Sequence, residues 1–347
     1  MFLKLKSRIK VELADYVRSV DKLYSLKKIS PVLSRHIKDF ISRKGKRIRP
    51  IFFLIGYLSF SKKTAPGLYR SAISIELLHD FLLVHDDIID KSDLRRGKPA
   101  MHTMLNNYLK KYKNIKFNGQ DLAIVIGDTL YAMAIQSFLA VKEDRKRKEE
   151  ALKIFIETAL RTTGGEFIEL LAGIKNIDKI TKPDIYRIYD LKTGNYTFAS
   201  PLAIGATLAG AKTNDIKKLF EYGLYLGRAF QIKDDIIGLF GEEEKIGKST
   251  LSDLQEAKKT ILIWRAYHCA DRKGKLTIKK IFSKNKVNKR DLLKMRRLIS
   301  ETGSLSYAKK EISTCVNIAQ NRLASVKIPP QYKKLLLGYS QGLINDN

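Results

Sequence analysis

Apolar residues recur at helical spacing along most of the chain. Between Ile73 and Ile89 they return every three or four positions, as on one face of an α-helix. The segments 121–140, 199–211 and 222–240 are apolar on nearly all sides, which is typical of helices buried in a large bundle. No segment sustains the apolar–polar alternation of a half-buried strand. The pattern therefore predicts an all-α fold of ten or more helices.

Prolines mark the joints between these helices, and none of the joints is long or polar enough to divide the core. The prolines at or near predicted helix starts are Pro31, Pro50, Pro66, Pro99, Pro183 and Pro201. We expect exposed basic loops at 110–118 and 272–288. We also expect one domain over 1–347, with a basic N-terminal helix in 1–30, a core over about 31–325 and a C-terminal helix to 347.

The chain is strongly basic. Its 347 residues contain 66 Lys and Arg against 36 Asp and Glu, a formal net charge of +30. Residues 1–50 hold fifteen of the basic residues against four acids, and residues 271–300 hold twelve against two. Solvated lysine-rich helix faces account for most of this charge, and peripheral contact of the basic ends with an anionic membrane comes next. A nucleic-acid partner is disfavoured, because zinc-ligand spacing, RNP-type aromatics and RGG tracts are absent from the sequence.

Other sequence features indicate a soluble or peripheral protein of the cytoplasm. Two cysteines, Cys269 and Cys315, are too few for a disulfide framework. The N-terminal segment has no apolar region of the signal-peptide type. The longest strongly apolar run, residues 51–60, is far shorter than the roughly 20 residues of a transmembrane helix.

Two acidic pairs interrupt this basic chain. His85-Asp86-Asp87-Ile88-Ile89-Asp90 is followed 148 residues later by Lys233-Asp234-Asp235-Ile236-Ile237-Gly238. On a helix Asp86 and Asp90 share a face, where like charges repel unless a cation neutralises them. A capping or salt-bridged carboxylate explains one aspartate but not the repeated pair. Oxygen ligands without a His or Cys array select Mg²⁺ or Mn²⁺, and Mg²⁺ in such sites binds substrate phosphates.

Basic residues stand where a phosphorylated ligand requires them. Lys46 and Arg49 precede an apolar helix, and Arg95-Arg96 follow the first acidic pair directly. Arginine is suited to bidentate contact with phosphate. In so lysine-rich a chain each of these signals is weak alone. Gly247-Lys248-Ser249 is not a P-loop, because the upstream glycine spacing is wrong and no strand precedes it.

Taken together and in order, these motifs resemble the polyprenyl synthetase family, the trans-isoprenyl diphosphate synthases, from about residue 30 to 325. The matching elements are Gly45-Lys46-Arg47-Ile48-Arg49-Pro50, Leu83 to Asp90 with Arg95-Arg96-Gly97, Gly127-Asp128, Lys192-Thr193, Gln231 with Asp234-Asp235, and Lys248 through Asp253-Leu254 to Lys258. The resemblance implies an antiparallel bundle around a central cavity (the isoprenoid synthase type I fold), normally a homodimer. It also implies head-to-tail condensation of isopentenyl diphosphate with an allylic diphosphate.

The resemblance also implies roles for individual residues. Asp86 and Asp90 would ligate two or three Mg²⁺ ions (or Mn²⁺ in their place) from one wall and Asp234 from the facing wall, with Asp87 and Asp235 in support. The allylic diphosphate would contact Arg95, Lys192, Thr193, Gln231, Lys248 and Lys258. Isopentenyl diphosphate would contact Gly45, Lys46, Arg49, His79 and Arg96.

The sequence departs from the family pattern at three places. The second acidic motif ends in Gly238 rather than Asp, Glu166 and Glu169 replace a Gln-x-x-Asp pair, and Ala257 replaces a common glycine. Three other protein classes remain as alternatives. A terpene cyclase would need an Asn/Asp, Ser/Thr, Glu triad at 234–238, an inactive subunit of a heteromeric synthase would typically lose one acidic pair, and a nucleic-acid-binding protein explains only the charge.

Product length is expected to depend on residues that precede Asp86 on its helix. One helical turn, 5.4 Å, is close to the length of an isoprene unit. Phe81 and Leu82 lie five and four residues before Asp86, so they are expected to form the floor of the product cavity; ordinary core packing also accounts for Phe81. In the resembling enzymes this arrangement suits geranylgeranyl diphosphate (C20), with farnesyl diphosphate second and a longer polyprenyl chain still open.

Overall fold

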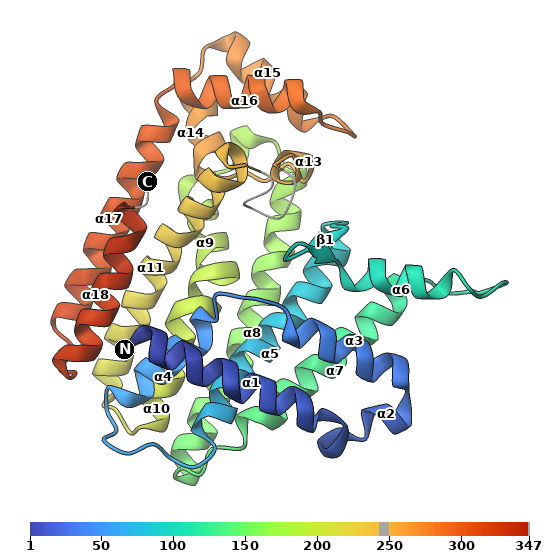
Figure 1. The fold of residues 1–347 in the computed structure, drawn as a ribbon. Coiled ribbons are helices and arrows are strands. Elements are labelled where there is room, and N and C mark those ends of the chain that lie inside the picture. Colours follow the sequence, from blue (N-terminus) through green and yellow to red (C-terminus); the bar gives the residue numbers. More distant parts are fainter. Residues whose placement is uncertain (243–249, 346–347) are drawn as a thin grey trace. The chain divides into compact units, whose positions relative to one another are not determined.

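The computed structural model describes residues 1–242 and 250–345. Helices dominate it (Figure 1), which confirms the all-α prediction of ten or more helices. The chain divides into two compact units. The first comprises Met1–Leu152 and Ile204–Gly210, and the second comprises Lys153–Ala203 and Ala211–Asn347.

The first unit carries the N-terminal helices and the first acidic pair. Its elements are α1 (Phe2–Tyr24), α2 (Leu26–Ile29), α3 (Pro31–Ser42), α4 (Ile48–Leu58), α5 (Leu68–Ile89), β1 (Leu94–Arg95), β2 (Lys98–Pro99), α6 (Met101–Leu109) and α7 (Gly119–Phe138). Two further helices, α8 (Arg145–Ile174) and α10 (Ser200–Leu208), contain residues of both units.

The second unit carries the second acidic pair and the C-terminal helices. Its remaining elements are η1 (Ile177–Lys179), α9 (Lys182–Tyr189), η2 (Asp190–Ala199), α11 (Thr213–Phe240), α13 (Ser252–Gln255), α14 (Ile261–Cys269), α15 (Arg272–Phe282), α16 (Lys289–Glu301), α17 (Ser304–Ala324) and α18 (Pro330–Asn345). α18 begins at the second residue of the Pro329-Pro330 pair.

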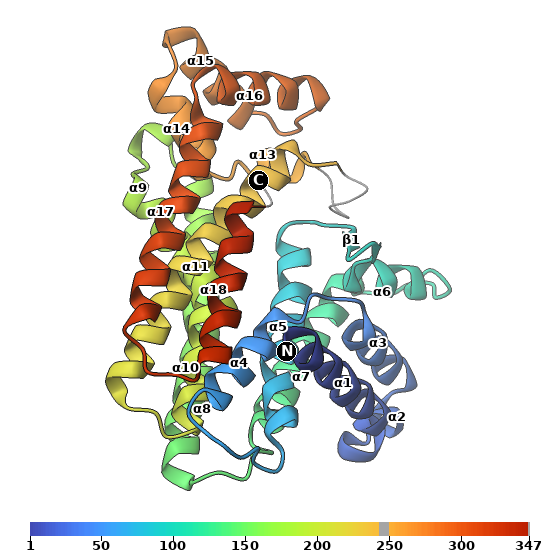
Figure 2. The same cartoon turned by 60° about the vertical axis from the view of Figure 1, so that its left-hand side comes forward.

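In the first unit, α5 and α7 run side by side in both views (Figures 1 and 2). The hydroxyl of Ser71 on α5 donates a hydrogen bond to the carbonyl of Phe138 on α7, at 2.8 Å. α4 completes this core with Phe52 and Phe53, both fully buried. Because residues 71–78 of α5 are all buried, the polar side chains in this part of the helix are held in fixed positions.

In the second unit, α11 packs between η2 and α17 (Figure 2). Glycines permit the close approach of α11 to η2. A Cβ on Gly227 would lie 2.1 Å from the Cα of Gly194, and one on Gly223 would lie 2.5 Å from backbone atoms of Ala199. η2 is a π-helix of 10 residues, a form of helix that often occurs at functional sites.

We predict that Gly227→Ala destabilises the protein by about 3 kcal/mol or more, because two backbones would have to move apart. The matched control is Gly338→Ala on α18, where a Cβ meets nothing within 4 Å. A helical Gly→Ala change without a clash is neutral or stabilising. Thermal or urea unfolding of both variants measures the difference, and equal stability of the two would contradict this account of the packing.

The structure corrects one expectation, the loop at 272–288, and adds two features that the sequence did not predict. Two-residue strands β1 and β2 form a hairpin that no alternation could reveal. Residues 272–282 are helix α15 rather than loop, because Asp271 caps its start and Ile278 and Ile281 are buried among the lysines. Among the described residues, α7 alone is long and apolar enough to span a membrane; it packs against α5 and α6.

Candidate active site

The first acidic pair lies at the C-terminal end of α5. Asp86 occupies the last turn and Asp90 is the capping residue, whose backbone N–H donates to the carbonyls of Asp86 and Ile88. Carboxylate oxygens of Asp86 and Asp90 approach within 4.8 Å of each other. Both side chains are partly exposed, so the pair presents oxygen atoms to solvent at one end of the helix.

Asp87 faces the other way and is fully buried. The Nε of Arg95 donates to it at 2.6 Å, and a terminal nitrogen of the same guanidinium donates to Asp86 at 3.0 Å. Burial raises the pKa of Asp87 to about 6, against the opposing effect of Arg95. One arginine therefore fixes the orientation of two adjacent aspartates, as the supporting role predicted for Asp87 requires.

The β1–β2 hairpin delivers Arg95 and Arg96 to different partners. Its two-residue turn consists of Arg96 and Gly97, with φ angles of 56° and 72°. Positive φ at both turn residues is the geometry of the tight hairpins that match strand twist. Because Arg96 is a turn residue and not a strand residue, its side chain can point toward α5. There its guanidinium lies beside a second pair of acids.

These second acids, Glu76 and Asp80, are buried one turn apart on α5. Glu76 accepts from Arg47 at 2.6 Å, and Arg96 lies 3.7 Å from Glu76 and 3.4 Å from Asp80. Burial, opposed by Arg96, raises the pKa of Asp80 to about 7. Glu76 and Asp80 are not among the site residues that the motifs predict, although acids on an apolar helix are a signal for a site.

His79 lies beside this cluster. Partial burial and then the charges of Arg49 and Arg96 lower the pKa of His79 well below its ordinary value, so the ring is neutral. Three of the residues predicted to bind isopentenyl diphosphate therefore lie close together, since the charges of Arg49 and Arg96 both act on His79. Lys46, a fourth, is exposed, and Gly45 precedes it.

In the second unit, α11 carries Asp234 and Asp235 on different faces. Asp234 is exposed, whereas Asp235 is buried. Asp235 accepts hydrogen bonds from the hydroxyl of Tyr189 and, at 2.8 Å, from the amide of Gln231. Burial raises the pKa of Asp235. This division repeats that of Asp86 and Asp87, with one aspartate accessible and its neighbour held in the core.

η2 places Lys192 and Thr193 beside these residues. Thr193 donates to the amide oxygen of Gln231 at 2.5 Å. Lys192 lies between the two glutamates of α8, 2.6 Å from Glu166 and 2.5 Å from Glu169. Both departures from the Gln-x-x-Asp pattern thus retain an acceptor for this lysine.

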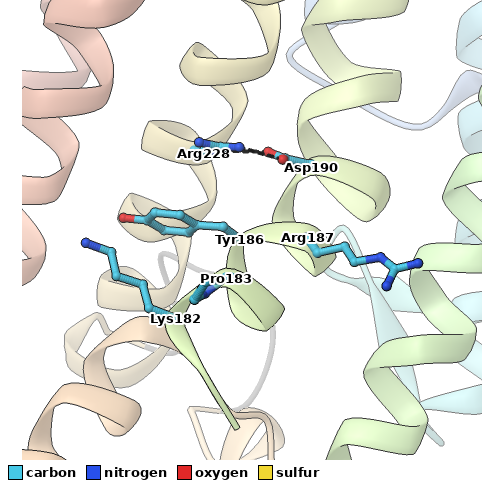
Figure 3. A pocket seen from close by; sticks show the side chains of 6 residues that line it. All are labelled: Lys182, Pro183, Tyr186, Arg187, Asp190 and Arg228. Carbon is cyan, nitrogen blue, oxygen red and sulfur yellow. Dashed lines mark hydrogen bonds and ion pairs between the residues drawn. The ribbon is translucent and has the colours of Figure 1, made fainter.

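A salt bridge anchors the start of η2. Arg228 on α11 donates twice to Asp190, at 2.6 Å each, beside a cavity of about 420 Å³ (Figure 3). The guanidinium also lies over the ring of Tyr186, 5.0 Å from its centroid. Asp190 precedes Lys192 and Thr193 directly in the chain, so this pair fixes the helix that presents them. Arg228 is not part of any motif that the sequence singles out.

Gly238 is explained by its neighbour Asp253. A Cβ at position 238 would lie 2.6 Å from a carboxylate oxygen of Asp253, which is itself buried. The side chain of Asp253 thus occupies the space that a larger residue at 238 would need. Lys258, also predicted to bind diphosphate, pairs with Glu256 at 2.6 Å. Lys248 lies outside the described residues.

Phe81 and Leu82 are partly exposed on α5. The ring of Phe81 lies between two others, with centroids 4.8 Å from His85 and 5.1 Å from Tyr131 on α7. An aromatic group of this kind forms a stiff surface one to two turns from the acidic pair. The geometry suits the floor predicted for the product cavity.

The geometry fits a divalent metal at the acidic residues. Asp86 and Asp90 offer only hard oxygen ligands, and Arg95 holds the neighbouring carboxylates in a fixed arrangement. Each unit combines one accessible aspartate group, one buried supporting aspartate and nearby cations. Fold and residues together define a helical protein with two accessible aspartate groups, each backed by a buried aspartate.

Comparison with known proteins identifies the family. The polyprenyl synthetase family matches residues 30–299. The short chain isoprenyl diphosphate synthase of Methanocaldococcus jannaschii is 31% identical over 302 residues, 87% of this chain and 83% of that protein. The geranylgeranyl diphosphate synthase of Methanosarcina mazei is 30% identical over 90% of this chain and 88% of its own. The chain therefore belongs to the polyprenyl synthetase family and is a prenyltransferase.

Solved structures agree with this assignment. The geranylgeranyl pyrophosphate synthase of Corynebacterium glutamicum, complexed with isoprenyl diphosphate and magnesium, is 25% identical and superposes with a TM-score of 0.88 over 99% of each chain. The heptaprenyl diphosphate synthase of Staphylococcus aureus, 26% identical, gives 0.79 over 99% of this chain and 98% of its own.

Proposed function

We propose that this protein condenses isopentenyl diphosphate with an allylic diphosphate, head to tail, to give an all-trans prenyl diphosphate. The observation that carries the proposal is the repeated arrangement of an accessible aspartate group backed by a buried aspartate. It occurs at the end of α5 and on α11. Both acidic pairs are retained, which disfavours an inactive subunit of a heteromeric synthase.

The metal-binding residues in this proposal are Asp86, Asp90 and Asp234, with Asp87 and Asp235 in support. Mg²⁺, or Mn²⁺ in its place, would neutralise charge on the diphosphate leaving group. We propose two or three ions. Arg95, already oriented by Asp86 and Asp87, contributes a fixed positive charge to the same ligand. Lys192, Thr193, Gln231, Lys248 and Lys258 are proposed as further contacts with the allylic diphosphate.

Cationic side chains make departure of the diphosphate favourable, because they stabilise negative charge as it develops. The allylic C1–O bond breaks, the diphosphate takes the electron pair, and an allylic cation remains. The double bond of isopentenyl diphosphate then attacks C1, and a proton leaves from its C2, with the released diphosphate as acceptor. Because the reaction proceeds through this cation, no enzyme nucleophile is required. Phe81 and Leu82 would exclude water, which would otherwise quench the cation.

We propose that Gly45, Lys46, Arg49, His79 and Arg96 bind isopentenyl diphosphate. The neutral state of His79 supports this role, because a neutral imidazole can donate one hydrogen bond without adding charge. Glu76 and Asp80 would then act as positioning residues, because Glu76 accepts from Arg47 and Asp80 lies beside the guanidinium of Arg96.

A titration of Asp80 follows from this arrangement. Its carboxyl is protonated below pH 7 and charged above it, so it holds Arg96 by charge only above about pH 7. We expect KM for isopentenyl diphosphate to fall as the pH rises from 6 to 8. Asp80→Asn should raise KM about tenfold at pH 8, which corresponds to about 1.4 kcal/mol.

Steady-state kinetics at several pH values test this prediction. The KM of the allylic substrate serves as the internal control, since the ionisation of diphosphate itself affects both substrates. Asp80→Asn should flatten the pH dependence for isopentenyl diphosphate alone. An unchanged profile in the variant would contradict the positioning role.

For the product we propose geranylgeranyl diphosphate. Geranylgeranyl diphosphate synthases are prominent among the relatives, and the relative from Aeropyrum pernix is a geranylfarnesyl diphosphate synthase, 31% identical. The aromatic group of Phe81 and Tyr131 supports a short cavity. Farnesyl diphosphate and a longer chain are the alternatives. Incubation with Mg²⁺, isopentenyl diphosphate and each of the C5, C10 and C15 primers, followed by sizing of the dephosphorylated alcohols, distinguishes them.

We infer that the protein is a homodimer. One face of α8 carries apolar side chains at helical spacing that remain exposed, by 71% at Leu160, 64% at Phe167 and 84% at Ile174. Ile156 and Leu171 continue the same row. A second copy packed on this row would bury it. Light scattering of the purified chain should give twice its mass of 39.6 kDa.

We also retain three proposals from the sequence: one catalytic domain over 1–347, a cytoplasmic location, and peripheral membrane contact through the basic ends. The cysteines support the location, since Cys269 is exposed, Cys315 is buried and both are free thiols. No nucleic-acid partner is proposed.

A further inference from the structure

The first unit contains an apolar groove apart from the acidic residues. It lies between the start of α3, the C-terminal half of α6 and the first half of α7, and has a volume of about 450 Å³. Its lining is almost entirely aliphatic and aromatic: Val32, Leu33, Leu105, Tyr108, Leu109, Tyr112, Ile115, Phe117, Leu122, Val125 and Ile126, with Ser30 at one edge. None of these residues has a part in the proposed reaction.

The segment that borders this groove is basic and exposed. Residues 110–118, which connect α6 to α7, are all exposed, as the sequence predicts. Figure 1 shows this segment projecting beyond α3 and α5 at the tip of α6. It carries Lys110, Lys111, Lys113 and Lys116, and the chain has no acidic residue between Asp93 and Asp121.

Apolar side chains alternate with these lysines and face solvent. Tyr112 is 48% exposed, Ile115 42% and Phe117 47%, yet all three also line the groove. The ammonium of Lys111 lies 4.2 Å from the ring centroid of Tyr108. Nearby, Ile29 is 69% exposed and directly precedes Ser30 at the edge of the groove.

The lysines of this segment are available to an outside partner. Within the described parts of the chain, 1–242 and 250–345, no ion pair joins any of the four to an acid. An ordinary solvated surface would carry such lysines but not three large apolar side chains among them. Lysines interleaved with Tyr and Phe are instead typical of surfaces that lie at a membrane interface.

We propose that the groove and the segment 110–117 dock on an anionic lipid bilayer. The lysines would contact lipid phosphates, and Tyr112, Ile115 and Phe117 would enter the interface, with acyl chain filling the groove. A second copy on this groove is disfavoured, because a two-fold interface here would bring its four lysines of the segment 110–117 close to the same four lysines of the first copy. A nucleic acid is disfavoured because the groove offers few polar groups to a base.

The lysines of this surface lie outside the basic ends that the sequence singled out, although Ser30, Val32 and Leu33 of the first end line one side of the groove. The surface also does not depend on the proposed reaction, since its residues lie outside the site. Attachment here would nevertheless place an enzyme with a long-chain amphiphilic product beside the bilayer that can accept it.

Vesicle flotation tests the proposal. The full chain should float with vesicles of 30% phosphatidylglycerol in phosphatidylcholine, but not with phosphatidylcholine alone, and the bound fraction should fall with salt. Each lysine near an anionic surface contributes about a fivefold change in partitioning. The variant K110Q/K111Q/K113Q/K116Q should therefore lose more than a hundredfold in partition coefficient.

Two matched controls make the result specific. K309Q/K310Q/K327Q/K334Q removes four exposed lysines of the second unit and should retain most of the binding. I115S/F117S, which leaves the charge unchanged, should weaken binding severalfold, whereas L276S/L293S, which changes two apolar side chains that are more exposed, should not. Activity with soluble primers should be unchanged in all four variants.

The proposal fails if the wild-type chain does not bind the anionic vesicles, or if both lysine variants lose binding equally. It also fails if I115S/F117S binds as tightly as the wild type, which would indicate a general polyanion surface such as one for nucleic acid. A change of oligomeric state in the segment 110–117 variants without a change in vesicle binding would assign the groove to a second copy and overturn the proposal.

Discussion

Asp86→Ala is expected to lower kcat by about a thousandfold or more. Asp86 presents its carboxylate beside that of Asp90, and it also accepts from Arg95, so its loss removes a proposed metal ligand and one of the two carboxylates that position Arg95. Stabilisation of charge on a leaving group is commonly the largest single contribution to catalysis of this kind. The measurement is the rate of isoprene incorporation at saturating substrate and Mg²⁺.

The matched control is Asp93→Ala, an exposed aspartate seven residues further along the same segment. It should retain nearly full activity. Thermal unfolding of both variants separates loss of catalysis from loss of fold, since Asp86 is not part of the core. Turnover of Asp86→Ala within a few-fold of the wild type would contradict the proposed role of the α5 acidic pair.

Phe81→Ala is expected to lengthen the product by one or more isoprene units. Phe81 stands between His85 and Tyr131, and its removal opens the space one to two turns from Asp86. One helical turn corresponds to about one isoprene unit in length. Sizing the dephosphorylated alcohols by chromatography against C15, C20 and C25 standards measures the change.

Leu83→Ala is the control, because Leu83 is on the same helical turn but two positions along, and therefore on a different face. Its product should match that of the wild type. If Phe81→Ala gives the wild-type distribution, Phe81 is a packing residue and the floor lies elsewhere. Tyr131, which the sequence did not single out, would then be the next position to change.

The helical architecture and the two acidic pairs were predictable because both depend on short-range spacing. Apolar periodicity predicts a helix, and two residues four apart, such as Asp86 and Asp90, share a face of any helix. The supporting contacts were not predictable, since they join residues distant in the chain. Tyr189 reaches Asp235 over 46 residues, and Arg47 reaches Glu76 over 29.

Three local features of the backbone could not be predicted from the sequence for a different reason. The turn at Arg96-Gly97 depends on positive φ angles in a hairpin too short for alternation. The π-helix around Lys192 depends on packing against glycines of α11, which propensity does not encode. Gly238, a departure from the family pattern in the sequence, becomes understandable only when Asp253 is seen to occupy its space.

The most direct test of the account is a crystal structure with Mg²⁺ and a thio-analogue of the allylic diphosphate, whose C1–S bond resists cleavage. We expect two or three ions, coordinated by Asp86, Asp90 and Asp234 and bridged by the diphosphate of the analogue. A bound analogue with no ion on any of these three carboxylates would contradict the central claim.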